Sequence, residues 1–277
     1  MSEAALVWLP WYGWLIAAVF GWFGLAYLLC LKTDNATWAD VAWGSSLPLI
    51  TLLTTWFLRG SLPFNPLTLT LIALPTLMYL RLGAYILWRV LTHPEKEDPR
   101  YTRFKEQVKD NVPLGLAWAY GLQATLMLVM MTPWVVYISQ NPRLLYIGNT
   151  QAWGCIALLL LGFIGETIAD GQLTRFKHQQ ANLSPEQRQA VCDTGLWGFS
   201  RHPNYFFQWV FWCGIAGLGF LSPLGWWSVL PPLVMLYFLV YGTGIKPTEA
   251  LAVERKGDAY RDYQRRVSPF VPWWPKA

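Results

Sequence analysis

The chain has 277 residues, of which 54% are hydrophobic and only 13% are charged, with a net charge of +5. Soluble domains carry about 25% charged residues, and here the apolar residues come in long uninterrupted runs, so an ordinary soluble protein is excluded. Strands of a membrane barrel would alternate in polarity, so the uniform runs predict an all-α, polytopic membrane protein. The basic residues cluster beside the apolar runs, which favours a role in topology, and we expect no nucleic-acid partner.

Seven segments reach the length of about 20 apolar residues that a spanning helix needs. In chain order they are residues 11–31, 38–58, 67–91, 114–138, 145–170, 203–221 and 225–244. The first lacks a basic leader and a small-residue cleavage site, which predicts a retained helix and not a signal peptide. No internal repeat stands out, so we expect one domain over residues 1–277.

Basic residues gather after the first, third, fifth and seventh segments, whereas the opposite loops hold Arg59, Arg143 and little else. The positive-inside rule then places the N-terminus outside and the C-terminus in the cytoplasm. We expect a bacterial inner (plasma) membrane protein whose functional face is cytoplasmic. The mixed-charge loop at residues 93–111 is either a solvated surface helix or part of that face.

Two residue types are expected to have structural roles. The four cysteines form no metal-ligand spacing, so we expect buried packing thiols and no metal site. Tryptophans near the segment ends are typical of interfacial anchors. They are Trp8, Trp11, Trp38, Trp56, Trp134, Trp226, Trp227, Trp273 and Trp274.

Polar groups inside a membrane helix cost about 2.5–3.5 kcal/mol each, so they indicate function by default. Glu166 and Asp170 are four residues apart, on one face of the fifth segment, and Arg175 and Lys177 follow. One interpretation is a helix end whose side chains snorkel and form local ion pairs. The other is a polar wall, in which the acids accept hydrogen bonds and the two cations hold a phosphate.

The stretch GLWGFSRHPNYFFQ concentrates polar side chains where the chain re-enters an apolar helix. Pro203 suits the first turn of that helix, and its free N–H groups together with Arg201 favour an anion. Asn204 suits a carboxamide or a ribose, and Tyr205 can stack on a ring. His202 is either a structural residue near the cap or part of the site.

The C-terminal segment EALAVERKGDAYRDYQRRVSPFVPWW is charged and amphipathic. It is either a membrane-surface helix, or it folds over the site and contributes Glu249 or one of the tyrosines, Tyr260 and Tyr263.

Together GLWGFSRHPNYF, ETIADGQLTRFK and YRDYQRRVSPFVPW resemble the steroid 5-alpha-reductase-like membrane family, in particular its bacterial DUF1295 branch, most strongly over residues 160–275. The resemblance implies NADPH-dependent reduction of a carbon–carbon double bond, or S-adenosylmethionine-dependent methyl transfer, as in other branches of the superfamily. Methyltransferases usually carry a Glu-Glu pair where this chain has Thr248-Glu249, which favours the reductase. The resemblance places the NADPH pocket at Glu166, Asp170, Lys177, Arg201, Asn204, Tyr205 and Glu249, and Arg175 and His202 complete the expected set.

The resemblance also places a proton donor near Tyr79 in the third segment, with Arg81 and Asp40 as possible partners. A neutral phenol can donate a proton and stabilise an oxyanion, although Tyr79 can equally be a packing residue. Ser45-Ser46 stand where the steroid reductases have a Gln-Glu pair, and Gln208 stands where they have an acid. We expect a lipophilic substrate, steroid-like or an isoprenoid or other lipid, which enters from the bilayer.

Overall fold

The computed structural model of the chain is helical, without a named strand among the residues it describes, which confirms the all-α class. The described residues are 3–140, 145–222 and 224–276. Internal contacts group the chain into two compact units, and the prediction of a single domain stays a prediction. Unit 1 is Met1–Trp153 with Leu218–Trp226, and unit 2 is Gly154–Gly217 with Trp227–Ala277.

Six stretches of the described chain are long and apolar enough to cross a membrane, which supports an integral membrane protein. They are Trp11–Thr33, Trp38–Leu58, Pro66–Thr92, Lys109–Ser139, Thr150–Ala181 and Gly225–Lys256. The expected count of seven is not supported. Helix α7 (Pro203–Phe220) forms where the sixth segment was expected, but it has only 18 residues and carries Asn204 and Gln208 near its start.

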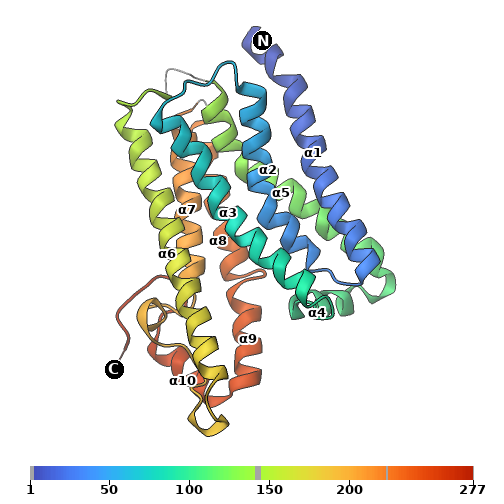
Figure 1. Cartoon of the computed structure of the whole chain (residues 1–277), viewed down its shortest axis with the longest axis vertical. Helices are drawn as coiled ribbons and strands as arrows, with labels where there is room; N and C mark the ends of the chain where they lie inside the picture. The colour runs from blue at the N-terminus through green and yellow to red at the C-terminus, as the bar shows by residue number, and fades with distance from the viewer. Residues whose placement is uncertain (1–2, 141–144, 223, 277) are drawn as a thin grey trace. The chain divides into compact units, whose positions relative to one another are not determined.

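The described residues of unit 1 form four long helices and one short helix. They are α1 (Glu3–Thr33), α2 (Trp38–Leu58), α3 (Pro66–Thr92), α4 (Pro99–Gln107) and α5 (Val112–Gln140). Helix α2 packs against α1, α3 and α5, and α4 lies near the end of α3 (Figure 1). The Asn65 side chain accepts a hydrogen bond from the Thr68 N–H, and Pro66 occupies the first turn, so α3 begins with the cap and proline that its sequence predicts.

Helices α2 and α3 approach closely at Gly44 and Gly83. A Cβ atom on Gly44 would lie 2.8 Å from the Cα of Gly83, and one on Gly83 would lie 2.8 Å from the carbonyl oxygen of Gly44. Both obstructing atoms belong to the backbone, so a side chain could be accommodated only if the helices separated. Small residues at such crossings let membrane helices pack backbone to backbone.

We expect Gly83→Ala to lower the free energy of unfolding by about 1–3 kcal/mol, because the added methyl overpacks this crossing. Thermal denaturation of the detergent-purified protein measures the effect. Gly24→Ala on α1 is the matched control, since nothing lies within 4 Å of the added Cβ and alanine favours the helix. Equal melting temperatures for the two variants would contradict the close approach.

The described residues of unit 2 form most of α6 and α7 and three shorter helices. They are α6 (Thr150–Ala181), α7, α8 (Leu230–Val240), α9 (Ile245–Lys256) and α10 (Asp258–Arg266). Helix α6 continues about three turns past Asp170, where the apolar run ends, because most of the residues that follow, such as glutamine, arginine and lysine, favour a helix. The expected helix over residues 225–244 is instead a 3₁₀ turn (Gly225–Val229) followed by α8, which ends before the glycines at positions 242 and 244.

Apart from Trp38, which is half-buried, the described tryptophans expected at interfaces divide into two groups. Trp56, Trp226, Trp227, Trp273 and Trp274 are each at least 60% exposed, as anchors must be. Trp11 and Trp134 are instead buried inside unit 1, so their assignment as anchors is wrong. The Trp8 side chain and Arg143 lie outside the described residues. The cysteines are free, and Cys30 and Cys192 are buried.

Candidate functional site

In unit 2, Arg201 joins the turn before α7 to the C-terminal segment. Its Nε and Nη2 atoms donate to the two carboxylate oxygens of Glu249, at 2.6 and 3.1 Å. Its Nη1 atom donates to the backbone oxygens of Gln264 and Val267, at 2.9 and 2.5 Å. The side chains of Arg201 and Glu249 are only 8% and 13% exposed. This paired contact is the two-point geometry in which a guanidinium binds a carboxylate most strongly.

Two more side chains reach the Glu249 carboxylate. His202 Nε2 lies 3.1 Å from one oxygen, and the Gln264 amide donates to the other at 2.7 Å. The His202 ring also stacks on the Tyr205 ring, with centroids 5.3 Å apart. Glu249 is therefore the centre of a polar cluster, here called the Glu249 cluster, formed by Arg201, His202, Glu249 and Gln264.

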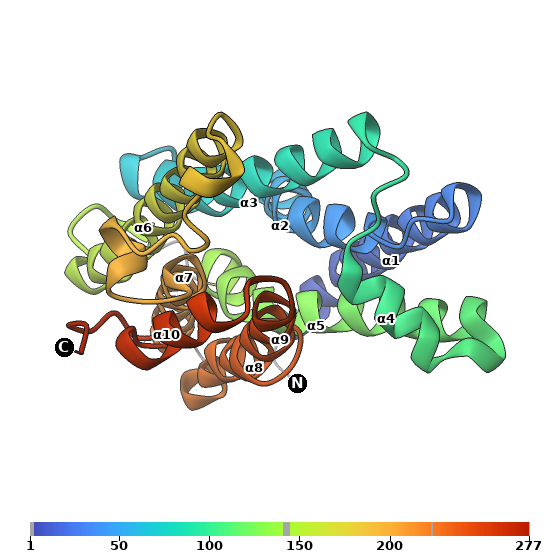
Figure 2. The ribbon, with the colours of Figure 1, turned by 90° about the horizontal axis from the view of Figure 1, so that it is seen from below.

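The chain after α10 runs alongside the same turn. The Ser200 hydroxyl donates to the Phe270 carbonyl at 2.7 Å, and the Arg201 N–H donates to the Ser268 carbonyl at 2.8 Å. Helix α10 folds back beside α9 (Figure 2). Of the two interpretations of the C-terminal segment, the structure therefore favours the one in which it folds over the turn and contributes Glu249.

The two tyrosines of α10 are buried parts of this fold. The Tyr263 hydroxyl donates to the Trp197 carbonyl at 2.6 Å, and both tyrosines pack with Val267 in one apolar cluster. Burial raises the pKa of Tyr260 and of Tyr263, so both phenols stay neutral at pH 7. They fix the C-terminal segment in place.

Helices α6 and α7 are joined by a second polar contact. The Asn204 amide donates to Asp170 at 3.1 Å. Glu166 lies one turn earlier on α6 and is 4% exposed, whereas Arg175 and Lys177, further along the helix, are exposed. Because α6 extends to Ala181, the interpretation of Asp170 as a helix-end residue is wrong, and the helix presents acids followed by accessible cations.

The residues predicted to be catalytic, Tyr79, Asp40 and Arg81, all belong to unit 1. Tyr79 is fully buried on α3. Asp40 accepts hydrogen bonds from Arg100 at 2.8 Å and from the Tyr101 hydroxyl at 2.7 Å. Burial raises the pKa of Tyr101, so its hydroxyl donates as a neutral phenol.

The charged loop that carries Arg100 is bound to the α1–α2 connection. Glu97 accepts from the Ala36 N–H at 2.6 Å and pairs with Lys105 at 2.9 Å. Lys105 also pairs with Asp34 at 2.9 Å. Asp98 caps α4, with the Arg100 N–H at 3.0 Å. The loop is thus fastened to unit 1 through its charged side chains and is more than a solvated surface helix.

A family model described as a protein of unknown function (DUF1295) matches residues 26–267, most of the chain. The chain belongs to the DUF1295 family. The match includes all four residues of the Glu249 cluster and confirms the membership that the motifs predicted. No curated protein and no solved structure matches this DUF1295 protein.

Sequence reasoning missed three residues of these clusters in the DUF1295 protein. Gln264 completes the contacts of Glu249, and Arg100 and Tyr101 bind Asp40. A glutamine in a charged helix carries no distinguishing pattern, so Gln264 could not have been found. Arg100 and Tyr101 lie in the loop that was considered as part of the functional face, but nothing in the sequence links them to a carboxylate about 60 residues earlier.

Proposed function

We propose that this DUF1295 protein is a membrane-embedded reductase that uses NADPH to reduce a carbon–carbon double bond in a lipophilic substrate. The observation that carries the proposal is the Asn204–Asp170 hydrogen bond, with exposed Arg175 and Lys177 further along the same helix. An amide beside a carboxylate can bind the amide and hydroxyl groups of a nucleotide. Exposed cations can pair with its phosphates.

The residues of unit 2 fit such a cofactor in two ways. Asn204, Asp170, Arg175 and Lys177 supply groups that contact a ligand directly. Arg201 is already bound by Glu249 and by backbone carbonyls, so we propose that the Glu249 cluster holds the turn that carries Asn204. NADPH, when bound, supplies the hydride.

Tyr79 of unit 1 remains our proposed proton donor, on the strength of the family resemblance. Its phenol would donate a proton to the substrate carbon, and Arg81 lies two residues further along α3. Asp40 is bonded to Arg100 and Tyr101, so we propose that it orients α4.

The proposed topology follows from the charges along the chain. With α7 counted as a seventh crossing, the N-terminus would lie outside and the C-terminus in the cytoplasm of a bacterial inner membrane. Arg175 and Lys177 would then face the compartment that holds NADPH.

We expect NADPH to raise the melting temperature of the purified protein. Lys177→Ala or Asn204→Ala should each weaken NADPH binding about tenfold, because each removes one hydrogen bond to a charged or polar group of the ligand. Lys109→Ala, which removes an exposed lysine from unit 1, is the control and should bind as the native chain does.

Unchanged NADPH affinity in both the Lys177 and the Asn204 variants would contradict the proposed pocket. A rise in melting temperature with S-adenosylmethionine but not with NADPH would favour the methyltransferase alternative and overturn the reductase.

A further inference from the structure

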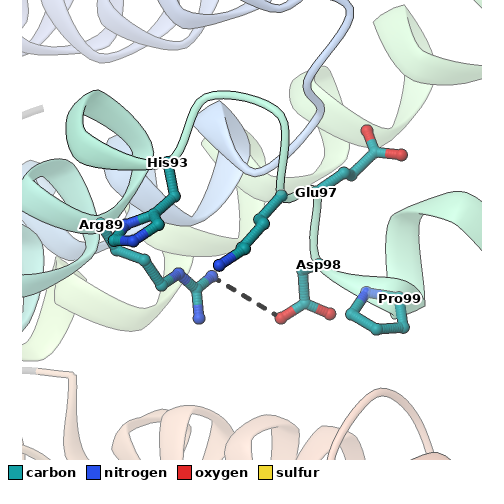
Figure 3. Close-up of a pocket in the computed structure, with 6 residues that line it drawn as sticks. Arg89, His93, Glu97, Asp98 and Pro99 are labelled. Carbon is teal, nitrogen blue, oxygen red and sulfur yellow. Dashed lines mark ion pairs between the residues drawn. The ribbon is translucent and has the colours of Figure 1, made fainter.

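A cavity of about 350 Å³ opens in unit 1, where α3 ends and the chain turns toward α4 (Figure 3). Its volume is at the lower end of the range for small-molecule sites, about 300–1,000 Å³. The lining residues are Arg89, His93, Lys96, Glu97, Asp98 and Pro99.

The two acids of this cavity form their shortest contacts with groups outside its lining. Glu97 accepts from the Ala36 N–H and pairs with Lys105 at 2.9 Å. Asp98 forms an ion pair with the Arg100 side chain at 2.9 Å and also accepts a hydrogen bond from the Arg100 backbone N–H. Burial raises the pKa of Asp98, but the hydrogen bonds and charge of Arg100 outweigh this effect and lower it. Arg100 and Lys105 also bind Asp40 and Asp34, so what the lining can offer a ligand is its remaining hydrogen-bond donors.

The remaining donors of the lining belong to Arg89 and Lys96. The Nη2 atom of Arg89 forms an ion pair with Asp98 at 3.8 Å, drawn as a dashed line in Figure 3, but this distance is too long for a hydrogen bond. Its Nε atom is buried and has no acceptor among the described residues. Lys96 is exposed. Figure 3 shows the Glu97 carboxylate turned away from Arg89 and His93. A buried donor without an acceptor indicates a ligand that brings an oxygen to it.

The surface of α3 that leads to the cavity is apolar. Tyr85, Trp88 and Leu91 are 56%, 58% and 63% exposed on successive turns. The Trp88 ring lies 6.3 Å from that of Tyr85 and 6.5 Å, edge-on, from that of His93. An aromatic and aliphatic strip that ends at basic side chains matches the two parts of a phospholipid. The acyl chains would lie along the helix, and the phosphate would lie at its basic end.

We propose that this cavity binds the phosphate-bearing headgroup of an anionic phospholipid whose acyl chains lie along α3. Arg89 and Lys96 contact the phosphate, and the size of the cavity admits a headgroup but not a whole lipid. Basic pockets beside membrane helices bind such headgroups. The site is independent of the proposed reductase activity. A free phosphate shares the headgroup chemistry but cannot use the apolar strip.

The test titrates phosphatidylglycerol into the full-length protein in phosphatidylcholine nanodiscs and follows bound lipid by native mass spectrometry. One basic residue near an anionic surface strengthens attraction about fivefold, so R89Q/K96Q should bind phosphatidylglycerol about 30-fold more weakly. The double variant K32Q/R59Q is the control, because it removes the same two charge types from exposed positions at the ends of α1 and α2. It should bind as the native chain does.

An equal loss of phosphatidylglycerol binding in R89Q/K96Q and in the control would overturn the proposal, because the lipid would then be attracted by the positive charge of the protein in general and not by this cavity. Equally tight binding of glycerol phosphate or inorganic phosphate would also overturn it, since the apolar strip would contribute nothing. If R89Q/K96Q does not fold, K96Q alone alters an exposed side chain and should weaken binding about fivefold. Unchanged binding in K96Q would then overturn the proposal.

Discussion

Replacing Glu249 by alanine is expected to lower the free energy of unfolding by about 3–5 kcal/mol, the cost of leaving a buried charge without its partner. Arg201 is 8% exposed on its side chain and would lose both hydrogen bonds to the carboxylate. His202 and Gln264 would lose the same acceptor. The melting temperature in detergent, with circular dichroism as the readout, measures the loss.

Two comparisons separate this effect from a general loss of charge. Asp258→Ala breaks an ion pair with Arg261 in which both side chains are largely exposed, and it should change stability little. The double variant R201M/E249L should be milder than Glu249→Ala, because no charge stays buried alone. If Glu249→Ala is no more harmful than Asp258→Ala, the Glu249 cluster does not hold the C-terminal segment.

Replacing Trp134 by alanine is expected to cost about 3 kcal/mol, at the lower end of values for deleting a buried tryptophan. Its side chain is fully buried in unit 1, and its indole N–H donates to the Leu71 carbonyl at 3.0 Å. Lipid is as apolar as the unit's interior, so the loss comes from packing and from this hydrogen bond, and little from transfer to water.

The matched control for Trp134→Ala lies on the same helix. Trp118 is 74% exposed on α5, so Trp118→Ala leaves no internal cavity and should shift the melting temperature little. Chemical denaturation of both variants in the same detergent compares them directly. If Trp134→Ala costs no more than Trp118→Ala, packing around Trp134 does not stabilise unit 1.

The helices were predicted well where an apolar run is bounded by a turn signal. Helix α2 has the expected bounds, Trp38–Leu58, and α7 begins at Pro203 as expected. Prolines and polar breaks mark these ends in the sequence itself, because proline suits a first helical turn and a polar residue ends an apolar run.

The helix ends were predicted poorly where the end of an apolar run is not the end of the helix. Helix α6 continues to Ala181 through polar residues, because residues that favour a helix can extend it beyond the apolar run. Helix α8 ends at Val240, before Gly242 and Gly244, because glycine disfavours a helix. Trp134 looked like an anchor because only its position near a segment end was visible, and burial depends on neighbours that are distant in the chain.

Sequence alone determined that this is an all-α membrane protein of the DUF1295 type with polar residues concentrated in α6, in the turn before α7 and in the C-terminal segment. The tertiary structure decided which of these residues meet. Arg201 and Glu249 are 48 residues apart, as Asp40 and Arg100 are 60 apart. Charge and spacing restrict the choice of partner, but only the folding of the chain selects one, because many acids and bases of the same kind compete for each contact.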